Sequence, residues 1–296
     1  MFVKCLNGKS QVLYMGTMAM KRFAISSMFI CCWLTVPSLA LELFEDFASP
    51  GKPKSGKNIK WSYTDQMRAV KGWQDIIPGD GFAYLTIDAD RKNDKDRKKQ
   101  KWPFQMISLS SIGPGHRLEM RAKNTVISGV ASFIFTYTEA DGMVDEIDVE
   151  IVGDDAQTPP ENHPTGPAGG WTDARFNTWA NADIKTLLPA ISHKKPIVNE
   201  AGKKVSHQDD SFHIYTIEWR TDSVDFFIDG VRQQTITEVI PDSASTVLVG
   251  MRHMSWTGKL DWQGTRTMIV DWLRIEPVDG KNTQGGAEAD VDKPRS

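Results

Sequence analysis

The sequence predicts an all-β protein, built as an antiparallel sandwich or barrel. Seven runs between residues 116 and 276 are rich in β-branched and aromatic residues, and several of them alternate apolar with polar side chains. No stretch shows a sustained helical period, and strands that follow one another without helices favour antiparallel pairing. A hydrophobic content of 40% with 25% charged residues is ordinary for a chain with a substantial core.

The runs are separated by turn residues. Ala131–Thr138 (ASFIFTYT) and Phe212–Arg220 (FHIYTIEWR) consist largely of side chains that fit a pleated, half-buried surface. Asp229-Gly230 lies between two runs and supplies the positive φ angles of a two-residue hairpin turn. In chain order the predicted strands are His116–Lys123, Ala131–Thr138, Asp145–Val152, Phe212–Arg220, Ser223–Asp229, Thr246–Met251 and Arg266–Glu276. Loops are predicted at residues 91–101, 153–170 and 192–210.

The N-terminal segment is predicted to be an export signal. Lys21 and Arg22 form a positive region, Phe23–Val36 forms an apolar stretch, and Pro37–Ala40 offers small residues for cleavage. The alternative is a membrane anchor, but the apolar stretch is shorter than the roughly 20 residues that span a bilayer. We therefore expect a secreted protein, extracellular or periplasmic, with no membrane association after cleavage.

Three parts of the chain follow from this interpretation. Residues 1–40 form the signal peptide, residues 41–278 form one β-sandwich domain, and residues 279–296 form a polar tail that is predicted to be disordered. The true start is open between Met1 and Met20. We expect a monomer, and the sequence does not fix the oligomeric state.

Cysteine content and charge exclude several functions. All three cysteines lie before the predicted cleavage site, so the mature chain has no thiol chemistry and no Cys-ligated metal. The signal region holds four basic residues and no acid, which leaves 31 basic against 38 acidic residues, a net charge of −7. A negative mature chain argues against nucleic acid as a partner.

The segment Asp145–Glu150 (DEIDVE) carries the chemistry. On a strand, Glu146, Asp148 and Glu150 lie on one face, while Ile147 and Val149 lie on the other. Three carboxylates this close repel one another, which raises the pKa of at least one of them. General acid catalysis needs one protonated carboxyl beside an ionised one. The two Glu side chains, leaning together across the shorter Asp, could close to the ~5–5.5 Å separation of a retaining glycosidase.

Two other interpretations of this segment are open. A solvated strand face is one, because acids are common on such faces. A calcium site is the other, because Asp141-Gly142 and Asp154-Asp155 flank the strand. A strand cannot wrap its carboxylates around an ion as a loop can, which weakens the calcium interpretation.

The segment resembles the E-x-D-x-E signature of glycoside hydrolase family 16, in the lichenase-like branch, whose catalytic strand is regular. Within this family it also resembles the succinoglycan-depolymerase-like members. Further segments look like family segments in the family's order, over about residues 42–277. They are Leu118–Arg121, Ser132–Thr138, Arg175–Trp179, His213–Gly230, Asp261–Gly264 and Val270–Leu273.

The resemblance implies a concanavalin-like jelly roll with a concave carbohydrate cleft and a double-displacement mechanism. By position, Glu146 would be the nucleophile, Glu150 the acid/base and Asp148 the assisting residue; the residues alone do not tell which Glu does which. The residues that look like cleft residues are Glu119, Arg121, Phe135, Tyr137, Asn177, Trp179 and Trp262. Asp271 sits where the family often binds a structural calcium ion, with a surface acid as the alternative. No cofactor is expected for catalysis.

Two departures from the family pattern concern the substrate. Val144 stands where lichenases carry Trp, and the connection over residues 153–172 is much longer. Both put mixed-linkage glucan specificity in doubt and leave the catalytic set intact.

We therefore expect a secreted retaining endo-β-glycanase that hydrolyses internal bonds of a glucose-containing polysaccharide. The substrate is open between mixed-linkage β-1,3-1,4-glucan and an acidic exopolysaccharide such as succinoglycan. The alternatives are a transglycosylase, a non-catalytic carbohydrate-binding sandwich and a purely structural surface protein. The basic run Arg91–Lys101 is open between a solvated loop and a site that attracts an anionic polymer.

Overall fold

The computed structural model describes residues 43–47, 62–64, 81–88, 104–153, 170–253, 255–258 and 262–278. The chain divides into two compact units, residues 1–38 and 39–296, and all described residues belong to the second. The export signal, the basic run Arg91–Lys101, Asp154-Asp155, Asp261 and the tail beyond Val278 lie outside the described residues. Within the described part, no helix is long and apolar enough to cross a membrane.

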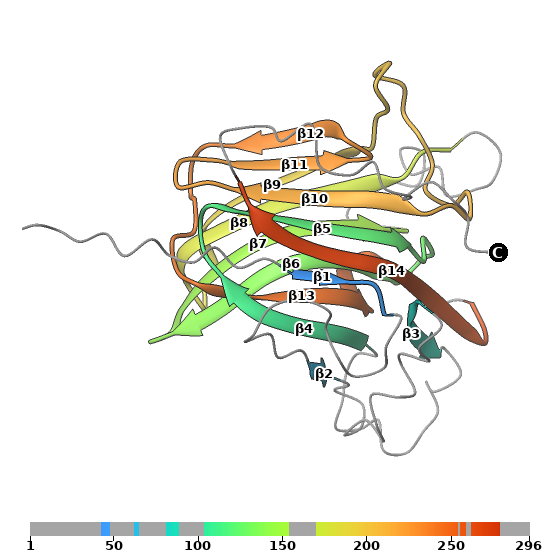
Figure 1. Ribbon diagram of the computed structural model, residues 1–296, viewed down its shortest axis with the longest axis horizontal. Helices are drawn as coiled ribbons and strands as arrows, with labels where there is room; N and C mark the ends of the chain where they lie inside the picture. Colours follow the sequence, from blue (N-terminus) through green and yellow to red (C-terminus); the bar gives the residue numbers. More distant parts are fainter. Residues whose placement is uncertain are drawn as a thin grey trace, which may run out of the picture. The chain divides into compact units, whose positions relative to one another are not determined.

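The described residues form fourteen strands and one 3₁₀ turn (Figure 1). In chain order these are β1 Leu43–Glu45, β2 Ser62–Thr64, β3 Ala83–Asp88, β4 Phe104–Ile112, β5 His116–Lys123, β6 Ala131–Ala140, β7 Met143–Val152, β8 Asp173–Asp183, β9 Leu188–Pro196, β10 His213–Trp219, β11 Val224–Ile228, β12 Val231–Ile236, β13 Ser245–Arg252, η5 Ser255–Thr257 and β14 Thr265–Pro277.

The strands make two antiparallel sheets of seven strands each. Sheet A has the order β1-β14-β5-β10-β11-β12, with β3 also paired to β14. Sheet B has the order β2-β4-β13-β6-β7-β8-β9. Every predicted strand is present, so the all-β antiparallel sandwich is confirmed. One loop prediction was wrong in part, because β9 continues through residues 192–196.

One hydrophobic core joins the two sheets. Leu118 and Met120 of β5 and Ile147 and Val149 of β7 belong to the same buried cluster. Phe176 of β8 contacts Phe226 of β11, with ring centroids 5.2 Å apart. Each strand therefore turns one face to the shared core, and its alternate residues point outward.

Two hairpins depend on Asp-Gly turns. Asp229-Gly230 joins β11 to β12 with φ angles of 51° and 77°, as the sequence predicted. Asp141-Gly142 joins β6 to β7 with φ angles of 53° and 79°. Both φ values are positive, as a type I′ turn requires. Asp141 therefore has a turn role. The calcium interpretation of this segment stays untested, because Asp154-Asp155 lies outside the described residues.

Candidate active site

The three carboxylates lie on the outer face of β7. Ile147 and Val149 are 0% and 1% exposed in the core. The alternate residues Glu146, Asp148 and Glu150 consequently point away from it. Asp148 and Glu150 are nevertheless buried, at 3% and 5% exposure, while Glu146 is half-buried. The segment is thus not the solvated strand face that the sequence left open.

The neighbouring strands complete this face in three rows. Residues directly opposite each other in an antiparallel pair share a face of the sheet. From β6 through β7 to β8 the rows are Tyr137–Glu146–Trp179, Phe135–Asp148–Asn177 and Phe133–Glu150–Arg175. Four of the predicted substrate-binding residues, Phe135, Tyr137, Asn177 and Trp179, therefore share the face with the carboxylates.

Asn177 links two of the carboxylates. Its Nδ2 atom donates hydrogen bonds to Asp148 Oδ2 and Glu150 Oε2, both at 3.2 Å. Ser192 of β9 donates to Asn177 Oδ1 at 2.6 Å, which fixes the orientation of the amide. Ser192 was not predicted, because the sequence analysis placed it in a loop. This chain of hydrogen bonds holds Asp148 and Glu150 in a set geometry.

Arg252 at the end of β13 is a further site residue that the sequence analysis missed. Its Nη2 atom lies 3.5 Å from Glu150 Oε1, and its guanidinium lies 5.3 Å from the Phe133 ring centroid. Burial raises the pKa of Glu146 and of Glu150, and the charge of Arg252 lowers both, so it acts on the two glutamates together. The only signal in the sequence was a lone cation ending the apolar run STVLVGM.

Arg175 of β8 also acts on Glu150. It lies in register with Glu150, and its charge lowers the pKa of that carboxyl. Its guanidinium lies 4.3 Å from the ring centroid of Trp256 in η5. Arg175 stood in a segment with family resemblance but was not predicted as a site residue.

Burial dominates the electrostatics of the three carboxyls. Desolvation raises the pKa of Glu146 to about 7, and it raises those of Asp148 and Glu150 as well. A hydrogen bond between Asp148 and Glu146 raises the pKa of Asp148 and lowers that of Glu146, so a proton on Asp148 is donated toward Glu146. The raised pKa values favour a protonated carboxyl within the group, which is the form that general acid chemistry needs.

Glu119 and Arg121 do not belong to this site, and their prediction as cleft residues was wrong. Both lie on β5 of sheet A, where Leu118 and Met120 face the core. They point outward on the opposite side of the sandwich from the β7 carboxylates. The sequence correctly predicted that Glu119 and Arg121 point away from the core. It could not predict to which of the two sheets this strand would belong.

Glu119 belongs instead to an ion-pair group on the outer face of sheet A. Arg117 Nε donates to Glu119 Oε1 at 2.9 Å, and Arg274 Nε donates to Glu119 Oε2 at 2.7 Å. Burial opposes ionisation of Glu119, but the two guanidinium groups outweigh it and lower the pKa of this carboxyl. Its role is structural.

Trp262 and Asp271 also have structural surroundings. Trp262 Nε1 donates to Ser128 O at 2.8 Å, and Arg266 lies 4.9 Å from its ring centroid, which places it against the β5–β6 connection. Asp271 Oδ2 is paired with the Arg121 guanidinium. This pairing competes with a metal ion for one oxygen of the carboxylate, and the structural calcium ion at Asp271 stays a prediction.

Residues 105–274, more than half of the chain, match the model of the family described as glycosyl hydrolases family 16. The chain belongs to this family. As a family 16 member it is a glycoside hydrolase, and all three β7 carboxylates fall inside the matched region.

Curated relatives of the family 16 chain are bacterial β-glucanases. A β-glucanase of Brevibacillus brevis is 27% identical over 247 residues, which cover 79% of this chain and 82% of that protein. A β-glucanase of Bacillus subtilis (strain 168) is 26% identical over 175 residues, 56% of this chain and 60% of that protein. The match to the second relative thus leaves more than a third of its length uncovered.

Solved structures agree with the jelly-roll fold of family 16. A β-1,3-1,4-glucanase (lichenase) from a mouse hindgut metagenome has a TM-score of 0.54 at 19% identity, and the match covers 80% of this chain and 99% of that one. The β-glucanase of Bacillus licheniformis has a TM-score of 0.53 at 18% identity, with coverage of 79% and 97%. The Crh5 transglycosylase has a TM-score of 0.51 at 22% identity, with coverage of 80% and 85%. Because the same fold serves different activities, the activity of this chain must be argued from its site.

Proposed function

We propose that this protein is a retaining endo-β-glycanase that cleaves internal β-glycosidic bonds of a glucose-containing polysaccharide. The observation that carries the proposal is the group Glu146, Asp148 and Glu150, held on one face of β7 with raised pKa values and an Asn177 amide between two of them. A carbohydrate-binding module or a structural protein has no use for buried, mutually repelling carboxylates. The β-glucanase names of the relatives support the same class.

In the proposed mechanism Glu150 protonates the leaving glycosidic oxygen while Glu146 attacks the anomeric carbon. Water activated by Glu150 then releases the sugar from Glu146. In the free enzyme Asp148 keeps its proton and donates a hydrogen bond to Glu146, and it shares the Asn177 amide with Glu150. It therefore contacts both glutamates. The positive charge of Arg252 offsets part of the negative charge of the ionised carboxylates.

Two variants test the roles. Glu146→Gln should abolish turnover on every substrate. Glu150→Gln should abolish turnover of polysaccharide yet recover activity on aryl glycosides with good leaving groups when azide is added, because azide needs no base. Unchanged kinetics in either variant would contradict the assignment of catalytic residues. Azide rescue of Glu146→Gln in place of Glu150→Gln would show that the two roles are reversed.

The stereochemical course gives a separate test. A retaining mechanism produces the β-anomer first, and an NMR time course of hydrolysis records it directly. First appearance of the α-anomer would exclude double displacement. Products longer than the starting oligosaccharide would identify transfer to sugar, the transglycosylase alternative.

We propose further that the substrate carries anionic groups. Beside Glu150, the same face of sheet B continues through Arg175 to Lys194 of β9, with Arg252 on the other side. Cations in a row suit a polymer with carboxylate substituents better than neutral mixed-linkage glucan. Digestion of both kinds of polysaccharide, followed by product analysis, tests this. Preference for the neutral glucan at low and high salt would refute it.

Export is also proposed, from the residues 1–40. N-terminal sequencing of protein recovered from the culture medium or periplasm should begin at Leu41. A mature protein that retains residues 1–40 in the membrane fraction would favour the anchor interpretation.

A further inference from the structure

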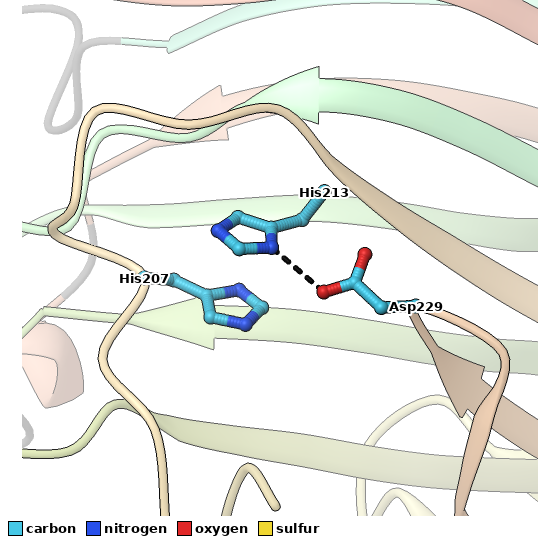
Figure 2. A group of neighbouring side chains, drawn as sticks. All are labelled: His207, His213 and Asp229. Atoms are coloured by element: carbon cyan, nitrogen blue, oxygen red, sulfur yellow. Dashed lines mark hydrogen bonds and ion pairs between the residues drawn. The ribbon is translucent and has the colours of Figure 1, made fainter. Parts of the chain in front are cut away.

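Figure 2 shows a second group of chemically reactive side chains, none of which belongs to β7. It consists of His207 on the β9–β10 connection, His213 at the start of β10 and Asp229 in the β11–β12 turn. One ligand atom from each of the three lies within 4.8 Å of the others. In the part of the chain that the structure describes, no other group of His, Cys, Asp and Glu meets this geometry.

His207 presents an unused nitrogen. The residue is 3% exposed, and its Nδ1 atom lies 2.7 Å from the Tyr215 hydroxyl. Its Nε2 atom is buried and has no hydrogen-bond partner among the described residues. A proton on Nδ1, donated to the Tyr215 oxygen, leaves a lone pair on Nε2. An unpartnered buried nitrogen is costly unless something binds it.

His213 is held between two carboxylates. Its Nδ1 atom lies 2.7 Å from Asp229 Oδ2, and its Nε2 atom lies 3.1 Å from Asp209 Oδ1. The His207 and His213 rings are stacked, with centroids 3.6 Å apart and an interplanar angle of 5°. Two imidazoles this close, with acids on either side, bring nitrogen and oxygen donors near one another.

The group opens into a pocket of about 520 Å³. Glu200, Asp209 and Asp229 are among the residues that line it, together with both histidines. The described lining contains no Lys or Arg. The pocket is therefore negative when His213 is neutral, and it offers room for ligands other than the protein.

We propose that this group binds one divalent transition-metal ion of the zinc class, with His207 Nε2, His213 Nδ1 and an Asp229 oxygen as ligands. Nitrogen and carboxylate donors suit such an ion, and a fourth position is left to water from the pocket. Asp209 would accept the His213 Nε2–H, and the Tyr215 oxygen would accept the His207 Nδ1–H. These are the outer contacts that orient metal-ligating histidines.

Binding requires a small rearrangement. Zinc–nitrogen bonds are ~2.0–2.1 Å, which puts tetrahedral ligand atoms about 3.4 Å from one another. Donor atoms up to 4.8 Å apart must therefore approach by as much as about 1.4 Å. The stacked rings must also turn so that each lone pair points at the ion. The ion would then tie the β9–β10 connection to the start of β10 and to the β11–β12 turn. It is a site beyond the proposed glycanase activity.

The test uses the full chain, stripped with EDTA and with its thiols alkylated so that the N-terminal cysteines cannot bind metal. Calorimetry with ZnCl₂ should give one site per chain, and saturating zinc should raise the melting temperature. Co²⁺ should give visible absorption bands typical of nitrogen and oxygen ligation. These three measurements use the unmutated protein, so they do not depend on the folding of any variant.

Variants locate the ion. His207→Gln and Asp229→Asn should each weaken zinc binding at least 100-fold, and Asp209→Asn should weaken it 10–100-fold as an outer contact. His193→Gln, at an exposed histidine of β9, is the matched control and should bind as the parent does. Absence of a one-to-one site, or zinc affinity that survives His207→Gln in a folded protein, overturns the proposal.

Discussion

The raised pKa of Glu146 makes a prediction about stability as well as catalysis. Glu146→Gln removes an ionisable group whose burial raises its pKa from 4.5 to about 7. A carboxyl with a raised pKa binds its proton more tightly in the folded state, so it lowers stability as the pH rises from about 4.5 through 7. Below that range the penalty is absent. The variant should therefore be more stable than the parent at pH 8 and about equal at pH 4.

The magnitude follows from the pKa. A tenfold change in proton affinity is worth about 1.36 kcal/mol, so the rise from 4.5 to about 7 sets an upper limit of about 3 kcal/mol. The attraction of Glu146 to Arg252 is already contained in this raised pKa. Glu146 is partly exposed, so solvent screening reduces the expected gain to about 1–2 kcal/mol at pH 8.

Urea denaturation at pH 4, 6 and 8, followed by tryptophan fluorescence, measures this difference. Glu200→Gln, at an exposed position, is the matched control and should leave the pH dependence unchanged. The reasoning is refuted if Glu146→Gln is no more stable than the parent at pH 8, or if both proteins lose stability with the same slope between pH 4 and 8.

Three further predictions concern the surrounding structure. Asn177→Ala should lower kcat by about 10–100-fold with little change in KM, because it frees Asp148 and Glu150 from their shared amide; an unchanged kcat would exclude a positioning role. Gly153→Ala should destabilise the fold by about 1–3 kcal/mol in urea, since an added Cβ would lie 2.2 Å from Ile127 N; equal midpoints would contradict the close approach. Glu119→Gln should reduce stability at pH 7 by about 1–3 kcal/mol, an effect that fades as the pH falls below about 4.5, and should leave kcat unchanged; a selective loss of kcat would return Glu119 to the site.

The sequence predicted what depends on neighbours along the chain. The period-2 pattern of Asp145–Glu150 was sufficient to place three carboxylates on one face, and the Asp-Gly dipeptide was sufficient to place the hairpin at Asp229. Arg252 could not be found this way, because it meets Glu150 across 102 residues of sequence through the pairing of β13 with β6 and of β6 with β7. Strand order is set by packing across the whole sheet, which no local pattern encodes.

The wrong prediction for Glu119 also came from strand order, which local sequence does not encode. Comparison of Glu119 with Glu150 distinguishes two kinds of buried carboxylate. Glu119 and Glu150 both alternate with core residues and both are almost fully buried. Glu119 receives two guanidinium groups in direct hydrogen bonds, and its pKa is lowered. Glu150 has one guanidinium at 3.5 Å and shares an amide with Asp148, and its pKa is raised. Ionisation of Glu119 thus stabilises the fold, whereas ionisation of the β7 carboxyls opposes it. The fold would be more stable with neutral carboxyls on β7, so their presence there needs a functional reason. Hydrolysis of a glycosidic bond supplies that reason.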